Sequence, residues 1–397
     1  MRSRVVVLVY IALFVGELSW SGITPLIPSY VTQYDLTDFE GGLVLSIASF
    51  GILVASLPAS VVTQRVNPRT LTLTAMAVIA AAGFAMAVAP GYWWIVAARL
   101  VFGVGFGFMW VSTAAWLADA AGADSPRVLA LTTSIVGLGA TLSPGYAGWV
   151  ADHFGLSAPF VGVGVVTTML FVLLLTDRSG TGLNKDPAPP ARELVRAAHS
   201  DKDLVMMLLL TTAAAVVWMT ADLLVPLRLD RFGFDVSDIG VVFSLAAIVF
   251  VTASALTARK ADTLARPKIA AAATFGLAAS ALVPALLAGV PAALIFLFGA
   301  SITTGVIVAL TFPFGLFSVA RGAVTVAVMS ALANVIWALS GMAGPTIGGA
   351  FAEWAGDGPA FGVLALVALL VAVWVARQRA SAEASPSADL ADDGPDR

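Results

Sequence analysis

The sequence predicts an all-α membrane protein of twelve transmembrane helices, arranged as two six-helix pseudo-repeats. The 397 residues are 59% hydrophobic and only 11% charged, whereas soluble domains average about 25% charged residues. Long apolar runs recur along the chain, and short segments of the first half return in the second. So few charges cannot cover the surface of a soluble fold, so we expect lipid to surround most of it.

Each predicted helix is an apolar run near the length needed to cross the hydrocarbon core, which is about 20 residues. The first run follows a basic start but lacks a small-residue cleavage site, so we predict that it stays as a span and is not a signal peptide. The first six spans are predicted at 5–31, 39–61, 70–90, 92–117, 128–150 and 158–176. The last six are predicted at 204–227, 238–258, 268–289, 292–318, 324–351 and 359–376.

Polar segments divide the chain into four predicted units. Residues 1–176 and 204–377 form the two six-helix bundles. Residues 177–203, rich in Pro, Gly and charge, form a cytoplasmic linker with a short helix near 192–198. Residues 378–397 form a disordered acidic tail in the cytoplasm.

The distribution of Lys and Arg predicts the orientation. With the N-terminus inside, all but three of the 21 basic residues lie on the cytoplasmic side. The exceptions are Arg99, within a span, and Arg228 and Arg231, outside. An even number of spans places both termini in the cytoplasm, and we expect the protein in the cell membrane.

An internal repeat supports the two-bundle architecture. In the fifth and eleventh spans, Pro144 matches Pro345 and Gly148 matches Gly349 at one constant offset. A second pair of segments, in the first and seventh spans, matches at nearly the same offset. Two matches in corresponding spans make chance an unsatisfactory explanation.

Three motifs in register give the chain a resemblance to the major facilitator superfamily. The loop after the second span resembles the family's G-x-x-x-D-R-x-G-R-[RK] at Arg65 and Arg69, although Gln64 replaces the Asp. The fourth span carries the arginine motif R-x-x-x-G-x-G-x-G from Arg99 to Gly107. The fifth span has a partial copy of the glycine-proline motif at Gly139, Pro144 and Gly148, and the eleventh has a fuller copy at Gly344, Pro345 and Gly349.

The resemblance implies roles for these motifs. Arg65 and Arg69, with Asp262 and Arg266 in the second half, are expected to form a charged latch at cytoplasmic helix ends. The glycine-proline motif implies proton-coupled export, often of drugs. Its prolines are expected to kink their helices, and gating or simple helix packing both remain open as the purpose of the motif.

Three charged residues are predicted inside the membrane, where a charge is costly and marks a functional site by default. Glu17 and Arg99 lie at similar predicted depths, so they can pair. We predict that Glu17 is the protonatable carboxylate and that its contact with Arg99 couples protonation to conformation. A static ion pair is the alternative. Asp222, predicted near the outer end of the seventh span, is assigned to the substrate cavity or to outer water.

Aromatic and polar residues inside spans complete the predicted substrate cavity. Trp20, Trp110 and Trp218 suit apolar or cationic substrates through stacking and cation–π contact. Thr304 and Asn334 could bind substrate. Ordinary core packing, lipid contact and helix–helix hydrogen bonding remain the alternatives for each of them.

Several function classes are excluded or disfavoured. The chain has no Cys and only two His, so no metal site or cofactor is expected. The net charge of −3 does not favour nucleic acid as a partner, and no nucleotide-binding G-x-x-x-x-G-K-[ST] loop occurs. We do not expect a membrane-embedded enzyme, a channel or a receptor.

The predicted function is therefore secondary active transport by alternating access. The favoured form is proton-coupled efflux of small amphipathic or drug-like molecules by a monomer. Its partners are then the substrate, protons and the lipid bilayer. The alternative is an importer or facilitator of a small polar metabolite or an organic anion, which Arg99 could bind.

Overall fold

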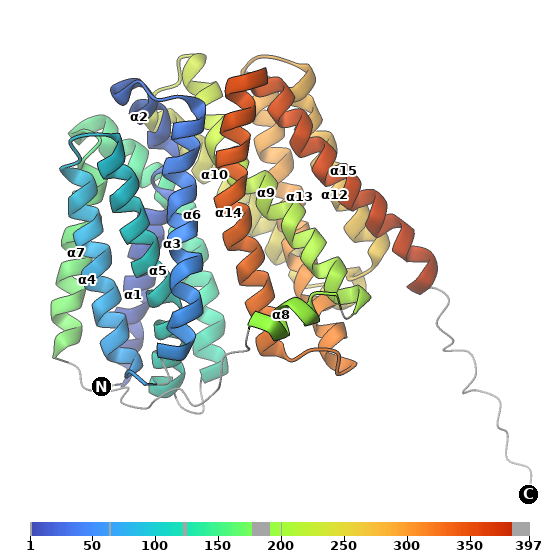
Figure 1. The fold of residues 1–397 in the computed structure, drawn as a ribbon, viewed down its shortest axis with the longest axis horizontal. Helices are drawn as coiled ribbons and strands as arrows, with labels where there is room; N and C mark the ends of the chain where they lie inside the picture. The colour runs from blue at the N-terminus through green and yellow to red at the C-terminus, as the bar shows by residue number, and fades with distance from the viewer. Residues whose placement is uncertain (1, 63–64, 122–124, 177–190, 200, 383–397) are drawn as a thin grey trace, which may run out of the picture.

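The chain folds into a bundle of long helices. A computed structural model describes residues 2–62, 65–121, 125–176, 191–199 and 201–382 (Figure 1). These ranges contain helices, turns and loops but no β-strand. Eleven apolar spans in them are long enough to cross a membrane, and the 30-residue helix α6 is a further long helix. The chain is therefore an all-α, multi-pass membrane protein, as predicted.

The described part of the first half contains six long helices and two short ones, η1 and α2. The bounds are α1 (Arg2–Ser21), η1 (Thr24–Leu26), α2 (Ile27–Tyr34), α3 (Asp38–Val62), α4 (Pro68–Ala87), α5 (Tyr92–Ala121), α6 (Ser125–Phe154) and α7 (Ala158–Leu175).

The second half again contains six long helices, after the short helix α8 (Ala191–Ala197), which agrees with the predicted helix near 192–198. The bounds are α9 (Lys202–Arg231), α10 (Val236–Ala258), α11 (Ala261–Leu264), α12 (Pro267–Leu286), α13 (Val290–Ala320), α14 (Val326–Ala355) and α15 (Asp357–Ala382). The predicted tail begins inside α15, and its residues 383–397 lie outside the described part, as do residues 177–190 of the predicted linker.

Helix starts follow local capping chemistry. The side chains of Asn67, Asp201, Asp235 and Thr325 accept hydrogen bonds from backbone N–H groups in the first turns of α4, α9, α10 and α14. A side-chain oxygen at this position satisfies a donor that has no partner within the helix.

The first predicted span, 5–31, corresponds to one candidate membrane span over Arg4–Tyr34, but its helix is interrupted. Regular helix α1 ends at Ser21, and the chain continues through η1 into α2. Pro25 and Pro28 lie at the starts of these two segments. Each proline lacks the N–H group that a continuous helix would need and its ring crowds the preceding turn, so the helix restarts instead of running through.

The two halves meet along two equivalent helix pairs. Helix α3 packs along α14, and α10 packs along α6. These are the second and fifth long helices of each half, so the interface has the pseudo-symmetry that the internal repeat predicts. Figure 1 shows the halves side by side, with α3 next to α14 at the boundary.

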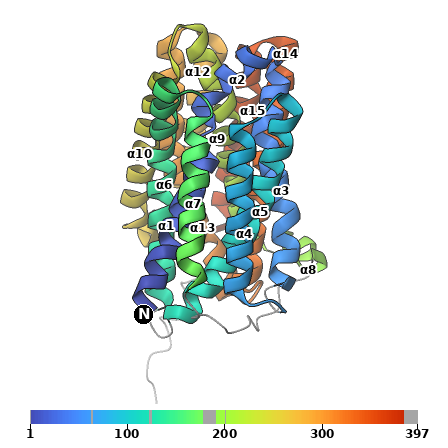
Figure 2. The same ribbon diagram turned by 90° about the vertical axis from the view of Figure 1, so that its left-hand side faces the viewer.

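The bundle has two ends, which we name by their short helices. The α2 end carries α2 and the starts of α3, α10 and α15, while the α8 end carries α8 and the N-terminus (Figures 1 and 2). A cluster of buried apolar side chains runs through the second half and also includes residues of the first, with Ile27 and Leu45 packed in the same cluster as Leu223 and Leu224.

Candidate functional site

A small cavity lies between the two halves. It has a volume of about 20 Å³, which is room for little more than one water molecule. The first half contributes the charged residue Arg99 and the second half contributes Asp222. The remaining lining residues are Trp20, Ser21, Thr24, Leu45, Ser49, Met219, Gly341 and Pro345. The arrangement places a basic side chain from one half and an acidic side chain from the other around one small, partly open cavity.

Arg99 is almost completely buried in α5, with 1% of its surface exposed. Its Nη1 donates a hydrogen bond of 3.1 Å to the carbonyl of Ser19 in α1. The guanidinium lies 5.9 Å from the centre of the Trp20 ring and 5.2 Å from that of Phe102. Its buried Nε has no hydrogen-bond partner among the described residues. Arg99 therefore lines the cavity and also keeps one buried N–H donor without a partner.

Glu17 is also buried, but it lies away from the cavity. Its Cβ and Cγ pack against Gly139 of α6 so closely that Gly139 has no room for a side chain. No ion pair joins Glu17 to Arg99 in the described conformation. Arg99 contacts α1 at Ser19 and Trp20. Glu17 lies earlier in α1 and packs against α6, so the two side chains do not meet. The predicted pair is thus not formed here, and the coupling role of Glu17 stays a prediction.

Asp222 lies deeper than the sequence suggested. Helix α9 continues to Arg231 and does not end near residue 227. Asp222 is therefore about nine residues, or about 14 Å, from the end of its helix. Its side chain is partly buried and lines the cavity that Arg99 also lines.

A row of aromatic rings leads away from the cavity along α5. Trp20 stacks on Phe106 with ring centres 5.9 Å apart, and Phe106 stacks on Trp110 at 6.4 Å. Trp110, at the far end of the row, is 38% exposed. The row offers a continuous set of ring faces between Arg99 and an exposed surface.

The other predicted cavity residues lie outside the small cavity. Trp218 packs against Phe250 with ring centres 5.0 Å apart. Thr304 is fully buried, and its hydroxyl has no hydrogen-bond partner among the described residues. Asn334 is exposed on α14. Of the six predicted substrate-cavity residues, the small cavity brings together only Trp20 and Asp222.

The predicted gating residues lie mainly at the interface between the halves. A Cβ on Gly148 would collide with the carbonyl of Val236, and one on Gly349 would collide with that of Asp38. The carbonyls of Pro144 and Pro345 meet Gly240 and Gly42 in the same way. Gly344 instead packs against Thr220 within the second half.

The predicted cytoplasmic latch is only partly visible. Arg69 donates hydrogen bonds to the carbonyls of Leu174, at 3.4 Å, and Leu175, at 2.8 Å, which end α7. Arg65 and Arg266 are exposed. The side chain of Asp262 lies outside the described part of the structure.

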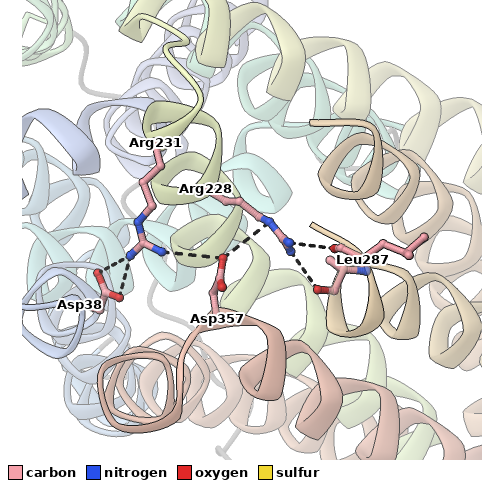
Figure 3. A network of polar contacts seen from close by, with 6 residues as sticks. Asp38, Arg228, Arg231, Leu287 and Asp357 are labelled. Carbon is pink, nitrogen blue, oxygen red and sulfur yellow. Dashed lines mark hydrogen bonds and ion pairs between the residues drawn. The ribbon is translucent and has the colours of Figure 1, made fainter. Parts of the chain in front are cut away.

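A polar network at the α2 end was missed by the sequence analysis (Figure 3). It consists of Asp38, Arg228, Arg231 and Asp357. Arg228 and Arg231 follow the predicted seventh span and were expected in the outer loop. Both belong to the last turn of α9, and Arg228 is buried. The sequence does contain a signal for this network. Two arginines lie one helical turn apart, and Asp38 and Asp357 stand at the starts of predicted helices. The described residues hold no group of three or more metal-ligating side chains.

Comparisons with known proteins agree with this arrangement. Residues 9–345 match the family model of the Major Facilitator Superfamily. The multi-drug resistance efflux pump PmrA homolog of Lactococcus lactis subsp. lactis (strain IL1403) is 24% identical over 206 residues, which are 50% of each protein. The aligned region thus spans half the length of that relative.

Solved structures share the fold over nearly the whole chain. A bacterial homolog to the human lysosomal transporter Spinster, in an inward-facing and unoccupied conformation, has a TM-score of 0.77 at 14% identity. The match includes 96% of this chain and 95% of that one. A POT family transporter in complex with a thioalcohol-conjugated peptide has a TM-score of 0.74 at 13% identity, with 95% and 96% covered. At such identities the likeness shows the fold alone.

Proposed function

Because this chain belongs to the Major Facilitator Superfamily and is therefore a membrane transporter, we propose that it exports small amphipathic or drug-like molecules in exchange for protons. The observation that carries the proposal is the pair of opposite charges, Arg99 and Asp222, which the two halves present to one cavity. Rocking of the halves about this cavity would expose it alternately to the two sides of the membrane.

The orientation of the transporter follows from its charges. The α8 end carries most of the basic residues, so we assign it to the cytoplasm, with both termini there and the protein in the cell membrane. The α2 end then faces outward, and the conformation described here is closed on that side. One chain supplies both sides of the cavity, which supports a monomeric transporter.

The aromatic row supports the class of substrate. The faces of Trp20, Phe106 and Trp110 offer apolar stacking and attraction for a cation. Asp222 supplies a negative charge at the inner end of the row. The similarity of half the chain to a multi-drug resistance efflux pump agrees with this assignment.

Glu17 is proposed to carry the coupled proton. It is buried in α1 against α6, without an ion-pair partner among the described residues, and α6 also forms the interface with α10. Movement of α6 during rocking would change the surroundings of Glu17 and thereby link proton binding to conformation.

One observation favours a second candidate function, the import of an organic anion. Arg99 lines the cavity, its buried Nε has no hydrogen-bond partner among the described residues, and a guanidinium binds carboxylates well. Uptake of small radiolabelled carboxylates into proteoliposomes would support this alternative if it required Arg99 and if export of cations were absent.

The test of export measures accumulation of a fluorescent lipophilic cation in efflux-deficient cells. The cells carry wild type, Glu17→Gln, the control Glu40→Gln at the α2 end or empty vector, and the amount of protein in the membrane is measured in each. We expect wild type and Glu40→Gln to lower accumulation, Glu17→Gln to fail, and an uncoupler to abolish the difference. Equal accumulation in all four strains, with protein present, would refute drug export.

A further inference from the structure

Four charged side chains form a chain of ion pairs at the α2 end (Figure 3). Arg231 lies between two carboxylates, with its nitrogens 3.1 Å from Asp38 and 3.7 Å from Asp357. Arg228, one turn earlier in α9, lies 3.6 Å from the same oxygen of Asp357. Asp38 begins α3 in the first half, and Asp357 begins α15 in the second. The network therefore spans the boundary between the halves.

Most of the network is anchored within the second half. Arg228 is buried and donates hydrogen bonds of 3.0 Å and 2.9 Å to the carbonyls of Pro284 and Leu287, at the end of α12. Its guanidinium also lies 5.5 Å from the ring centre of Phe361 in α15. These contacts fix Arg228, and through it Asp357, relative to α12 and α15. They do not depend on the position of the first half.

Of the ion pairs in this network, the one between Arg231 and Asp38 crosses from one half to the other. It sits directly at the crossing of α3 and α14, where Gly349 packs against the carbonyl of Asp38. Any movement that separates α3 from the second half at the α2 end must break this pair, while it leaves the pairs of Asp357 in place.

The surroundings make the pair easy to break and to form again. The Arg231 side chain is 51% exposed, and it keeps Asp357 as a partner when Asp38 leaves. Asp38 lies in the first turn of α3, where the helix dipole and free N–H groups stabilise a negative charge. Each charge is therefore still stabilised after this end opens. The free energy needed to break the pair remains within the range of a partly exposed ion pair.

We propose that Asp38 and Arg231 form a releasable ion pair, here called the clasp, that holds the transporter closed at the α2 end. Arg228 and Asp357 stay in the second half and hold Arg231 in position. The clasp rests on the proposed alternating access. It biases the equilibrium toward the conformation closed at this end, and it has no part in choosing the substrate. Weakening it shifts the equilibrium toward the conformation that is open at the α2 end.

The absence of cysteine from the sequence permits a direct test. Leu223 of α9 is fully buried at the α2 end, where its side chain packs against Gly41, Gly42 and Gly349. Leu223→Cys thus places a single thiol beneath the clasp, and the rate of its reaction with a polar maleimide reports opening at that end. All variants carry this reporter in lipid nanodiscs, without substrate or proton gradient.

Asp38→Asn and Arg231→Gln are expected to raise the labelling rate about two- to fivefold, as expected for a partly exposed ion pair. The double variant should be no faster than either single variant. Glu40→Gln is the matched control, because this carboxylate lies in the same turn of α3 and accepts a hydrogen bond from Thr37 within the first half. It should leave the rate unchanged.

Salt provides a second measurement without the variants. Raising the ionic strength screens an exposed pair, so labelling of the reporter protein should speed up while labelling in the Asp38→Asn background should not. Equal rates in Asp38→Asn and Glu40→Gln, or an equal salt response in both backgrounds, would overturn the clasp. Because the readout needs no transport, failure of the clasp is distinguishable from failure of the proposed export.

Discussion

Gly240 of α10 lies directly against the carbonyl group of Pro144 of α6, with no space for a side chain between them. The same relationship joins Gly42 of α3 to Pro345 of α14 in the other interface. The two crossings use corresponding residues of the internal repeat, so the repeated glycine-proline pattern has a packing purpose at the boundary between the halves.

Gly42→Ala should destabilise the closed conformation by about 1–3 kcal/mol, because an added methyl group forces backbones apart in a fully packed contact. The measurement is thermal unfolding of the purified protein in detergent. Gly137→Ala is the control, since a Cβ at Gly137 in α6 meets no atom within 4 Å. There the gain in helix propensity, about 1 kcal/mol, should raise stability. A similar change in both variants would contradict the crossing.

Arg99 and Asp222 should be energetically coupled through their shared cavity. We expect Arg99→Gln and Asp222→Asn each to lower stability, because each leaves a charge in the interior without its counter-charge. The double variant should be more stable than the sum of the single effects predicts, with a coupling of about 0.5–3 kcal/mol. A parallel cycle with Glu17→Gln and Arg99→Gln should give a smaller coupling in this conformation, and equal couplings would argue against the geometry.

Arg69→Gln should lower the free energy of unfolding by about 1.5–3 kcal/mol, the range for hydrogen bonds from a charged donor. Its guanidinium donates to the last carbonyls of α7, which have no partners within their own helix. Arg65→Gln changes an exposed side chain of the same loop and should have no measurable effect. Both are compared by thermal unfolding, and equal losses would show that the loop charge matters and not the contact.

Asp201→Ala should cost about 1 kcal/mol of stability through loss of a helix cap. The carboxylate accepts hydrogen bonds from the N–H groups of Asp203 and Leu204 at the start of α9. Burial raises its pKa, but the hydrogen bond from Arg321, together with those backbone donors, outweighs burial and leaves the pKa below 3.8. Since the folded-state pKa is depressed, this stability is present above pH 3.8 and is lost as the pH falls through the folded-state value. Unfolding curves should therefore differ between wild type and Asp201→Ala more at pH 7 than near pH 3, and an equal difference at both values would contradict the role of the carboxylate.

The sequence was sufficient to predict the architecture because the bilayer imposes a simple rule. Each span must be long and apolar, and the matches of Pro144 with Pro345 and of Gly148 with Gly349 revealed the two halves. Hydropathy does not report backbone breaks, however, so the interruption between α1 and α2 was missed although Pro25 and Pro28 were visible.

Pairings across the interface were harder to predict. Depth along a helix suggested that Glu17 would meet Arg99, but it carries no information about which way a side chain points around the helix. Asp222 was placed about five residues from the end of its helix because the polar end of α9 was taken as loop. For the same reason the contacts of Arg231 with Asp38 and Asp357 were not foreseen.

The glycine crossings also bear on how fast the transporter can switch. Where backbone meets backbone, as at Gly42 and Gly240, no side chain has to change rotamer when the surfaces part. Interdigitated side chains would have to withdraw from one another, which adds an activation barrier to separation. Smooth contacts lack that barrier, so the two halves can separate at these crossings without rearranging side chains there.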